Sequence, residues 1–178
     1  MQTASCAKPA SYLLPRICET VPLRLSCKTA PLCLSCPLPG DVSFVSGALN
    51  APAQLQALTL CPTKAGYGCK LTAQLHLPVC LHFACGCETI FRTGCIQLSI
   101  QALLRTPSSA ALQYIPQAEL CLRNVFMQDN SFCAEFDLGL CLYAVQMQPV
   151  QLCIPCPESK PDCTPFFNLP LYPELPHR

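Results

Sequence analysis

Cysteine is the residue type with the most chemical potential in this sequence. The chain has 17 cysteines among 178 residues, almost one residue in ten. Such a density usually marks a scaffold held by disulfides in an oxidising compartment. A chain of this length can bury a sufficient core without such bonds, so we expect the thiols to serve a purpose other than folding. Because the count is odd, at least one cysteine must be free or bonded to another chain.

Two C-x-x-C pairs could form a metal site. One pair is Cys33 and Cys36, the other is Cys153 and Cys156, and a proline follows each pair. Four thiolates could hold zinc in a tetrahedral site, or an iron–sulfur cluster. However, 116 residues separate Cys36 from Cys153, far more than compact zinc ribbons use, so metal binding is the alternative interpretation. A redox-active pair is less favoured still, because that motif requires a helix N-terminus to lower the thiol pKa.

Candidate catalytic groups are few. Cys80 and His82 are two residues apart on one predicted strand face, so their Cα atoms lie roughly 6.6 Å apart and a Cys–His dyad could form. The favoured interpretation is two polar positions on an exposed strand. Glu135 and Asp137 likewise resemble solubilising charges. The chain has no G-x-S-x-G, no H-E-x-x-H and no glycine loop for phosphate. We therefore expect no enzyme, no catalytic residue and no cofactor.

The overall composition excludes several other classes of protein. Charged residues make up 12% of the chain and the formal net charge is +1, so the basic excess of a nucleic-acid binder is missing. Hydrophobic residues make up 51%, which argues against disorder driven by charge. No run of roughly 18 apolar residues is present that could span a membrane. We expect neither a nucleic-acid partner nor a membrane span.

Proline divides the chain into three predicted parts. Residues 1–40 contain 6 prolines and 5 cysteines, and residues 149–178 contain 8 prolines and 3 cysteines. Proline lacks a backbone donor and restricts φ, so we expect both segments to be extended arms that are poor in regular structure. Residues 41–148 hold the remaining 5 prolines and form the predicted β-domain.

The central part shows the period-two alternation of half-buried strands. Turn signals occur at 64–68 and 127–130, and no comparable window has a helical period. We therefore predict an all-β fold, an antiparallel β-sandwich or jelly roll. The predicted strands are 42–46, 54–61, 69–85 (broken or bulged at Pro78), 87–92, 95–102, 117–123 and 131–147.

The alternation also places several thiols. Cys80, Cys121, Cys133 and Cys141 share the strand face of the charged residues, whereas a buried structural cysteine would lie among the aliphatic side chains. One interpretation is that these thiols are exposed for bonds between neighbouring strands or subunits. The other is that the proline-rich arms form a second layer that covers them.

The plan of the chain, a cysteine-bearing arm at 1–40 followed by the strands of 41–148, resembles the Cys-rich structural proteins of Firmicute endospores, in particular the endospore appendage (Ena) pilins. Those subunits are jelly rolls whose N-terminal connectors form disulfides with other subunits of a fibre. The resemblance implies synthesis in a mother cell without a secretion signal and oxidation outside. Residues 1–30 indeed lack the apolar stretch of about 7–15 residues of a signal peptide.

Together these features predict a structural, self-assembling protein on the spore surface or elsewhere outside the cell. It would be a disulfide-linked subunit of a fibre, a pilus-like appendage or a surface layer, with itself and related subunits as partners. The alternative is a zinc-binding or thiol-buffering protein that uses Cys33, Cys36, Cys153 and Cys156. The candidate cysteines for bonds within or between chains are Cys6, Cys18, Cys33, Cys36, Cys80, Cys121, Cys133, Cys141, Cys153, Cys156 and Cys163.

Overall fold

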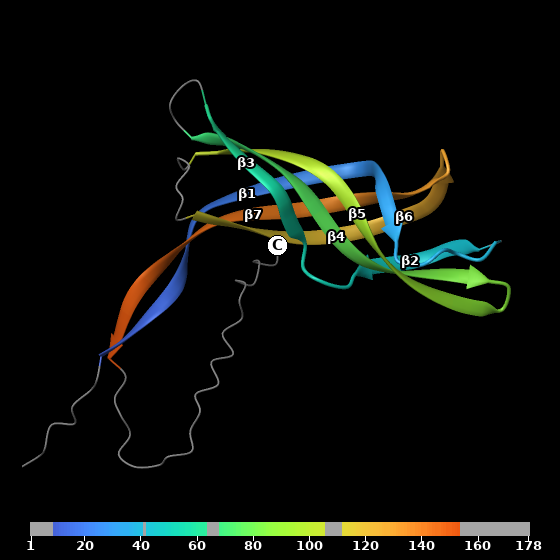
Figure 1. Cartoon of the computed structure of the whole chain (residues 1–178), viewed down its shortest axis with the longest axis horizontal. Coiled ribbons are helices and arrows are strands. Elements are labelled where there is room, and N and C mark those ends of the chain that lie inside the picture. Colours follow the sequence, from blue (N-terminus) through green and yellow to red (C-terminus); the bar gives the residue numbers. More distant parts are fainter. Residues whose placement is uncertain (1–8, 41, 64–67, 106–111, 154–178) are drawn as a thin grey trace, which may run out of the picture. The chain divides into compact units, whose positions relative to one another are not determined.

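The structure is a computed structural model that describes residues 9–40, 42–63, 68–105 and 112–153. Within these residues the protein is all-β and antiparallel, as predicted, and no helix is long and apolar enough to cross a bilayer. The strands, labelled in Figure 1, are β1 (Pro9–Leu34), β2 (Ser43–Leu49), β3 (Gln54–Pro62), β4 (Cys69–Cys85), β5 (Glu88–Leu104), β6 (Leu112–Gln128) and β7 (Ser131–Cys153).

All seven strands belong to one hydrogen-bonded sheet. Its order is β2-β4-β5-β1-β7-β6, and β3 pairs with β4 beside this path. β1 is therefore the link between β5 and β7, and Figure 1 shows β1 and β7 running side by side. The chain forms two compact units. One, Leu13–Gln148, contains most of the sheet; the other contains the first residues of β1, up to Tyr12, and the last residues of β7, from Pro149. The predicted division at residues 40 and 148 stays a prediction.

Tight turns set the register of the two long hairpins. Asp129 and Asn130 connect β6 to β7 with φ of 48° and 60°, the positive values that a type I′ turn requires at both central residues. The turn predicted at 127–130 is thus confirmed. Gly86 begins the two-residue loop between β4 and β5 with φ of 60°, which glycine adopts without a steric penalty. Apart from Cys87, which belongs to this loop, the two strands predicted at 87–92 and 95–102 both lie within the single strand β5, on either side of Gly94.

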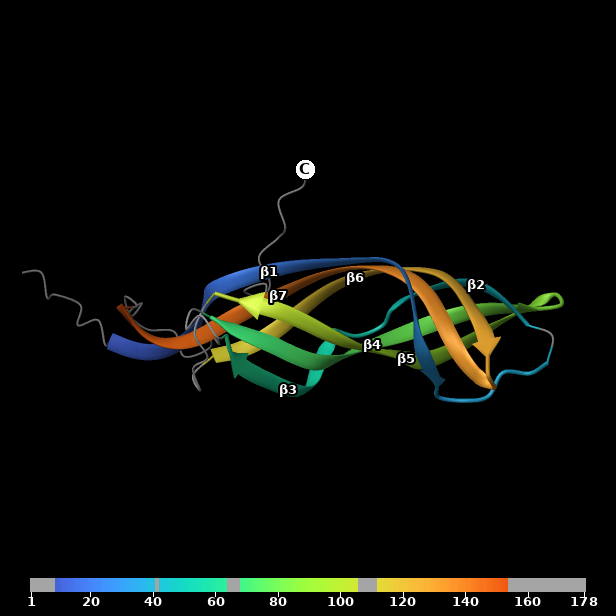
Figure 2. The same ribbon diagram turned by 90° about the horizontal axis from the view of Figure 1, so that it is seen from above.

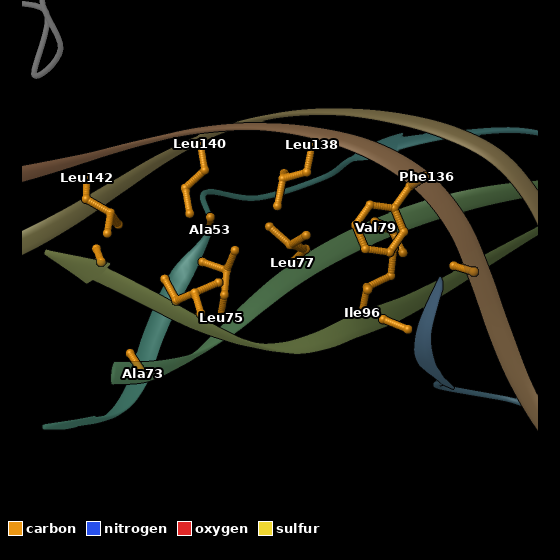
Figure 3. Close-up of a cluster of buried hydrophobic side chains, with 14 of the residues drawn as sticks. Ala53, Ala73, Leu75, Leu77, Val79, Ile96, Phe136, Leu138, Leu140 and Leu142 are labelled. Atoms are coloured by element: carbon orange, nitrogen blue, oxygen red, sulfur yellow. The ribbon is translucent and has the colours of Figure 1, made fainter. Parts of the chain in front are cut away.

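The core lies between β4 and β5 on one side and β7 on the other. Figure 3 shows Leu138 and Leu140 of β7 pointing toward the side chains of β4. Most residues that the alternation assigned to the apolar faces are less than 5% exposed, which confirms the assignment for them: Leu71, Ala73, Leu75, Leu77, Val79, Leu81, Phe83, Ile96, Ile100, Ala134, Phe136, Leu138, Leu140 and Leu142. Tyr143, which the alternation assigned to the charged face, is buried as well, at 6% exposed.

The sheet folds over on itself until its two end strands meet. In the middle of the view in Figure 2, β1, β6 and β7 run above β4 and β5. At the contact between the end strands, Gly47 of β2 faces Leu122 of β6: a Cβ added to Gly47 would lie 2.7 Å from Cδ1 of Leu122 and 2.8 Å from Cδ2 of Leu81. A side chain at this position would therefore require Leu122 and Leu81 to shift.

The expectation that residues 1–40 are poor in regular structure is wrong for most of that segment, because Pro9–Leu34 forms strand β1. The inward positions change phase inside this strand, from Val21, Leu23 and Leu25 to the even positions of Ala30 and Leu32. The change occurs around Cys27, whose φ of 48° marks an irregularity that inserts an extra residue. A pattern with a fixed period of two therefore does not identify one continuous strand across such a phase change.

A bulge at Pro78 is also not what the structure shows. β4 keeps an unbroken register with β5 through Pro78, which is the Cα partner of Cys95. On its other side β4 changes partner here, because its pairs with β2 end at Val79 and its pairs with β3 begin at His76. The Pro78 carbonyl accepts a hydrogen bond of 3.1 Å from the Asn50 main-chain N–H on that side. Proline has no backbone N–H to donate, but neither β2 nor β3 pairs with β4 at this position, so no ladder hydrogen bond is lost.

Candidate functional site

The thiols lie outside the core. Of the thirteen cysteines whose side chains the structure describes, only Cys69 is buried; seven are exposed and five are half-buried. Free cysteine normally belongs to the most buried residue types, so this distribution is unusual. The exposed thiols are those of Cys18, Cys27, Cys33, Cys36, Cys61, Cys87 and Cys121.

The four thiols that the alternation placed on the charged face all lie away from the core. Cys121 is exposed, and Cys80, Cys133 and Cys141 are half-buried. Their positions follow directly from strand parity, since each alternates with an inward aliphatic or aromatic residue. Half-burial fits partial cover by neighbouring side chains, so both interpretations of this face, a subunit interface or a layer of arm residues, stay predictions.

Two cysteines face each other across strands. Cys33 of β1 and Cys95 of β5 are Cα partners in the antiparallel ladder. Burial raises the pKa of the Cys95 thiol, the Leu77 main-chain N–H opposes this increase, and the nearby Cys33 thiol adds to it. Cys95 was not among the predicted candidates, although its parity with Gln97 indicated an outward position. Its pairing with Cys33 depends on the register between β1 and β5, which no local pattern reports.

A charged cluster surrounds two further thiols. Asp137 of β7 accepts a hydrogen bond of 2.8 Å from the Cys27 N–H and one of 2.8 Å from Nε of Arg123. Nη2 of Arg123 bonds the same carboxylate oxygen as Nε does. The Cys27 N–H and then Arg123 lower the pKa of Asp137, while that carboxylate raises the pKa of Arg123. Cys121 is the Cα partner of Asp137, so the cluster spans β6, β7 and β1. Asp137 therefore does more than solubilise the strand.

Cys69 occupies a different environment at the start of β4. It is 1% exposed, and burial followed by the Glu19 carboxylate raises its thiol pKa. Burial, then Cys69 and Glu19, also raise the pKa of Tyr114, whose hydroxyl is buried without a hydrogen-bond partner among the described residues. Glu19 itself accepts a hydrogen bond of 2.8 Å from the Arg105 N–H. A buried thiol of raised pKa is a poor nucleophile, so Cys69 is a packing residue.

The structure gives His82 partners other than Cys80. Nδ1 of His82 is 3.2 Å from Oγ of Ser46, and the His82 ring packs edge-on against Phe91 with centroids 4.4 Å apart. These contacts favour the interpretation of positions 80 and 82 as polar-face residues over a catalytic dyad.

The structure describes only part of the predicted four-thiolate site. Cys33 and Cys36 are both exposed. Cys156 lies outside the described residues, as do Cys6 and Cys163, and Cys153 is the last residue of β7. Among the side chains that the structure describes, no three His, Cys, Asp or Glu residues are grouped to hold a metal ion. The zinc site formed by both pairs stays a prediction.

A groove of about 460 Å³ lies beside the β6–β7 hairpin. None of the described residues that line it can act as an acid, a base or a nucleophile. Its lining consists of Leu38, Pro39, Gly40, Val42, Phe44, Phe83, Val125, Phe126, Met127 and Phe132.

Comparison with known proteins adds no relative. No protein-family model, curated protein or solved structure matches the chain.

Proposed function

We propose that this protein is a self-assembling structural subunit whose chains are joined by disulfide bonds, in a fibre or layer outside the cell. The observation that carries the proposal is the outward position of the thiols: twelve of the thirteen described cysteines are exposed or half-buried, and the core needs only one. A thiol held at the surface can react with a partner, whereas a buried thiol only fills space.

The amount of potential cross-linking also favours connection between chains. A domain is stable by about 5–15 kcal/mol, and a typical disulfide adds about 2–4 kcal/mol. The 17 cysteines could supply eight bonds, well beyond what folding of this core requires. Covalent links between subunits would persist on dilution or in denaturant, when a non-covalent interface dissociates. The resemblance of the sequence to endospore appendage pilins is the ground for proposing a spore-surface location.

We infer a β-sandwich of jelly-roll type as the finer architecture of the subunit. The support is the position of the core between β4 and β5 on one side and β7 on the other, together with the way that β1 links them. Strands that pass from one layer to another do so at bends or bulges, and Cys27 provides such an irregularity in β1.

Electrophoresis of the native full-length protein tests the proposed function. Boiling in detergent without reductant should leave a ladder or material too large to enter the gel, and reductant should collapse it to one band near 19.3 kDa. Replacing the exposed Cys18, Cys36 and Cys121 with serine should shorten the ladder. Cys69→Ser is the matched control and should leave the ladder unchanged, because Cys69 is buried.

A single monomer band under both conditions would contradict the proposal. Free-thiol titration with elemental analysis then decides the alternative: reduced sulfur with stoichiometric zinc would indicate a metal-binding protein that uses Cys33 and Cys36.

A further inference from the structure

The seam between β1 and β5 is the most consequential contact in the sheet. In the strand order it joins β1, β7 and β6 to β5, β4, β2 and β3. Its described ladder is short: the Cα pairs are Leu32 with Ile96, Cys33 with Cys95 and Leu34 with Gly94. One more hydrogen bond, of 3.0 Å from the Ser35 N–H to the Thr93 carbonyl, continues it. Few backbone hydrogen bonds therefore hold the two parts of the sheet together.

We propose that Cys33 and Cys95 form a disulfide within one chain and fasten this seam. In the ladders of β1 with β5, β2 with β4, β3 with β4, β4 with β5 and β6 with β7, this is the one described place where two cysteines are Cα partners. The inference goes beyond assembly and does not depend on it. It removes Cys33 from the thiols available to neighbouring subunits.

The spacing of the two residues suits a bond. The Ser35–Thr93 hydrogen bond lies two residues along the ladder, so Cys33 and Cys95 occupy a hydrogen-bonded pair with a Cα separation of about 5.5 Å. Disulfides have Cα separations of about 4.4–6.8 Å. Facing Cβ atoms lie about 4.5–5.5 Å apart, with hydrogen-bonded pairs at the far end of this range, so closure to the roughly 3.5–4.5 Å of a disulfide needs a shift of about 1–2 Å. Gly94 brings the strands close, since a Cβ there would lie 2.9 Å from the Cys33 carbonyl oxygen.

The two thiols differ in access, which gives the reaction an order. Cys33 is exposed and Cys95 is half-buried, with its Sγ 3.7 Å from the Ile96 carbonyl oxygen. The Cys33 thiolate attacks a low-molecular-weight disulfide, such as oxidised glutathione, and releases one small thiol. The Cys95 thiolate then attacks Sγ of Cys33 and releases the second. The two protein thiols lose two electrons to the small disulfide, and their two protons end on the released thiols.

A peptide map of the full-length protein tests the bond. After oxidation in a glutathione buffer and alkylation, trypsin should release residues 93–105, whose only cysteine is Cys95, joined to residues 29–64. In the Cys36→Ser/Cys61→Ser variant, Cys33 is the only cysteine left in 29–64, so the joined peptide identifies the bond. Recovery of Cys95 alkylated, or joined to any other peptide, would overturn the proposal.

Isotope mixing separates this proposal from assembly. When ¹⁵N-labelled and unlabelled protein are mixed in the reduced state and then oxidised, an intrachain bond gives only fully labelled and fully unlabelled joined peptides. Mixed peptides would show a bond between chains and would overturn the intrachain assignment, while leaving disulfide-linked assembly intact. A single monomer band on the non-reducing gel, together with unmixed joined peptides, would support the intrachain bond and contradict disulfide-linked assembly.

Thermal unfolding gives a second readout. Cys95→Ser should lower the Tm of the oxidised protein by about 5–15 °C and leave the Tm of the reduced protein nearly unchanged. Cys61→Ser, a control at an exposed thiol whose Cα partner is Lys70, should change neither. An equal loss for Cys95→Ser in both states would show that the side chain and not the bond stabilises the seam.

Discussion

The main-chain N–H of Cys27 donates a hydrogen bond of 2.8 Å to Oδ1 of Asp137, 110 residues further along the chain. Cys27 is the residue of positive φ at which β1 changes phase. Its N–H cannot take part in a regular ladder there, so a side chain satisfies it instead. Arg123 holds the same carboxylate from β6. One acidic side chain thus ties the irregular point of β1 to the β6–β7 hairpin.

Replacing Asp137 tests this function. Asp137→Ala should lower the Tm, because the Cys27 N–H and the Arg123 guanidinium both lose their acceptor. Asp137→Asn should cost less, since an amide oxygen can still accept from Cys27. Glu135→Ala on the same strand is the matched control. Equal Tm values for the Ala variants of Asp137 and Glu135 would show that the carboxylate only solubilises the strand.

Stability should depend on pH through the same group. The Cys27 N–H and Arg123 hold the pKa of Asp137 below its ordinary value in the folded protein. The stabilisation is therefore complete above the ordinary carboxyl pKa of about 4 and is lost as the pH falls through the folded pKa. Tm measured from pH 7 downward should show this loss, and Asp137→Asn should reduce it. If Tm depended on pH identically in the variant, Asp137 would not be the group that causes the loss.

A methyl group added at Gly47 should displace the side chains of Leu122 and Leu81. Gly47→Ala places a Cβ against Leu122 and Leu81, and overpacking of this kind costs about 1–3 kcal/mol of the free energy of unfolding. In the double variant Gly47→Ala/Leu122→Ala, the shortened side chain at position 122 no longer meets the added Cβ, so that part of the clash should disappear. Gly40→Ala is the control, because no atom lies within 4 Å of its added Cβ. Denaturant titration measures all three, and equal midpoints for both single variants would mean that β2 does not approach β6.

The thiols should react with alkylating reagents at different rates. Cys69 is buried and its thiol pKa is raised, so in the reduced, folded protein it should react at least about tenfold more slowly than the exposed Cys61 or Cys87. Timed labelling with iodoacetamide and mass spectrometry measures this order. In denaturant the difference should vanish. Rapid labelling of Cys69 under native conditions would contradict the core described above.

The face of each residue in the long strands could be predicted from the sequence, because side-chain direction in a strand alternates locally. The positions of Phe136 and Asp137 on opposite faces need only that rule. The same rule placed Cys80, Cys121, Cys133 and Cys141 away from the core. It failed for residues 9–34, since the irregularity at Cys27 shifts the phase and the prolines suggested an irregular arm.

Only the tertiary structure decided which of these residues meet. Cys33 and Cys95 are 62 positions apart, and Cys27 and Asp137 are 110 positions apart. Each contact depends on which strands are neighbours and on their register. Register is set by turns and by the packing of all inward faces at once, whereas alternation is a property of a few consecutive residues. The sequence by itself therefore determined that Cys80, Cys121, Cys133 and Cys141 point away from the core, and the folded sheet determined that Cys33 has a facing partner in Cys95.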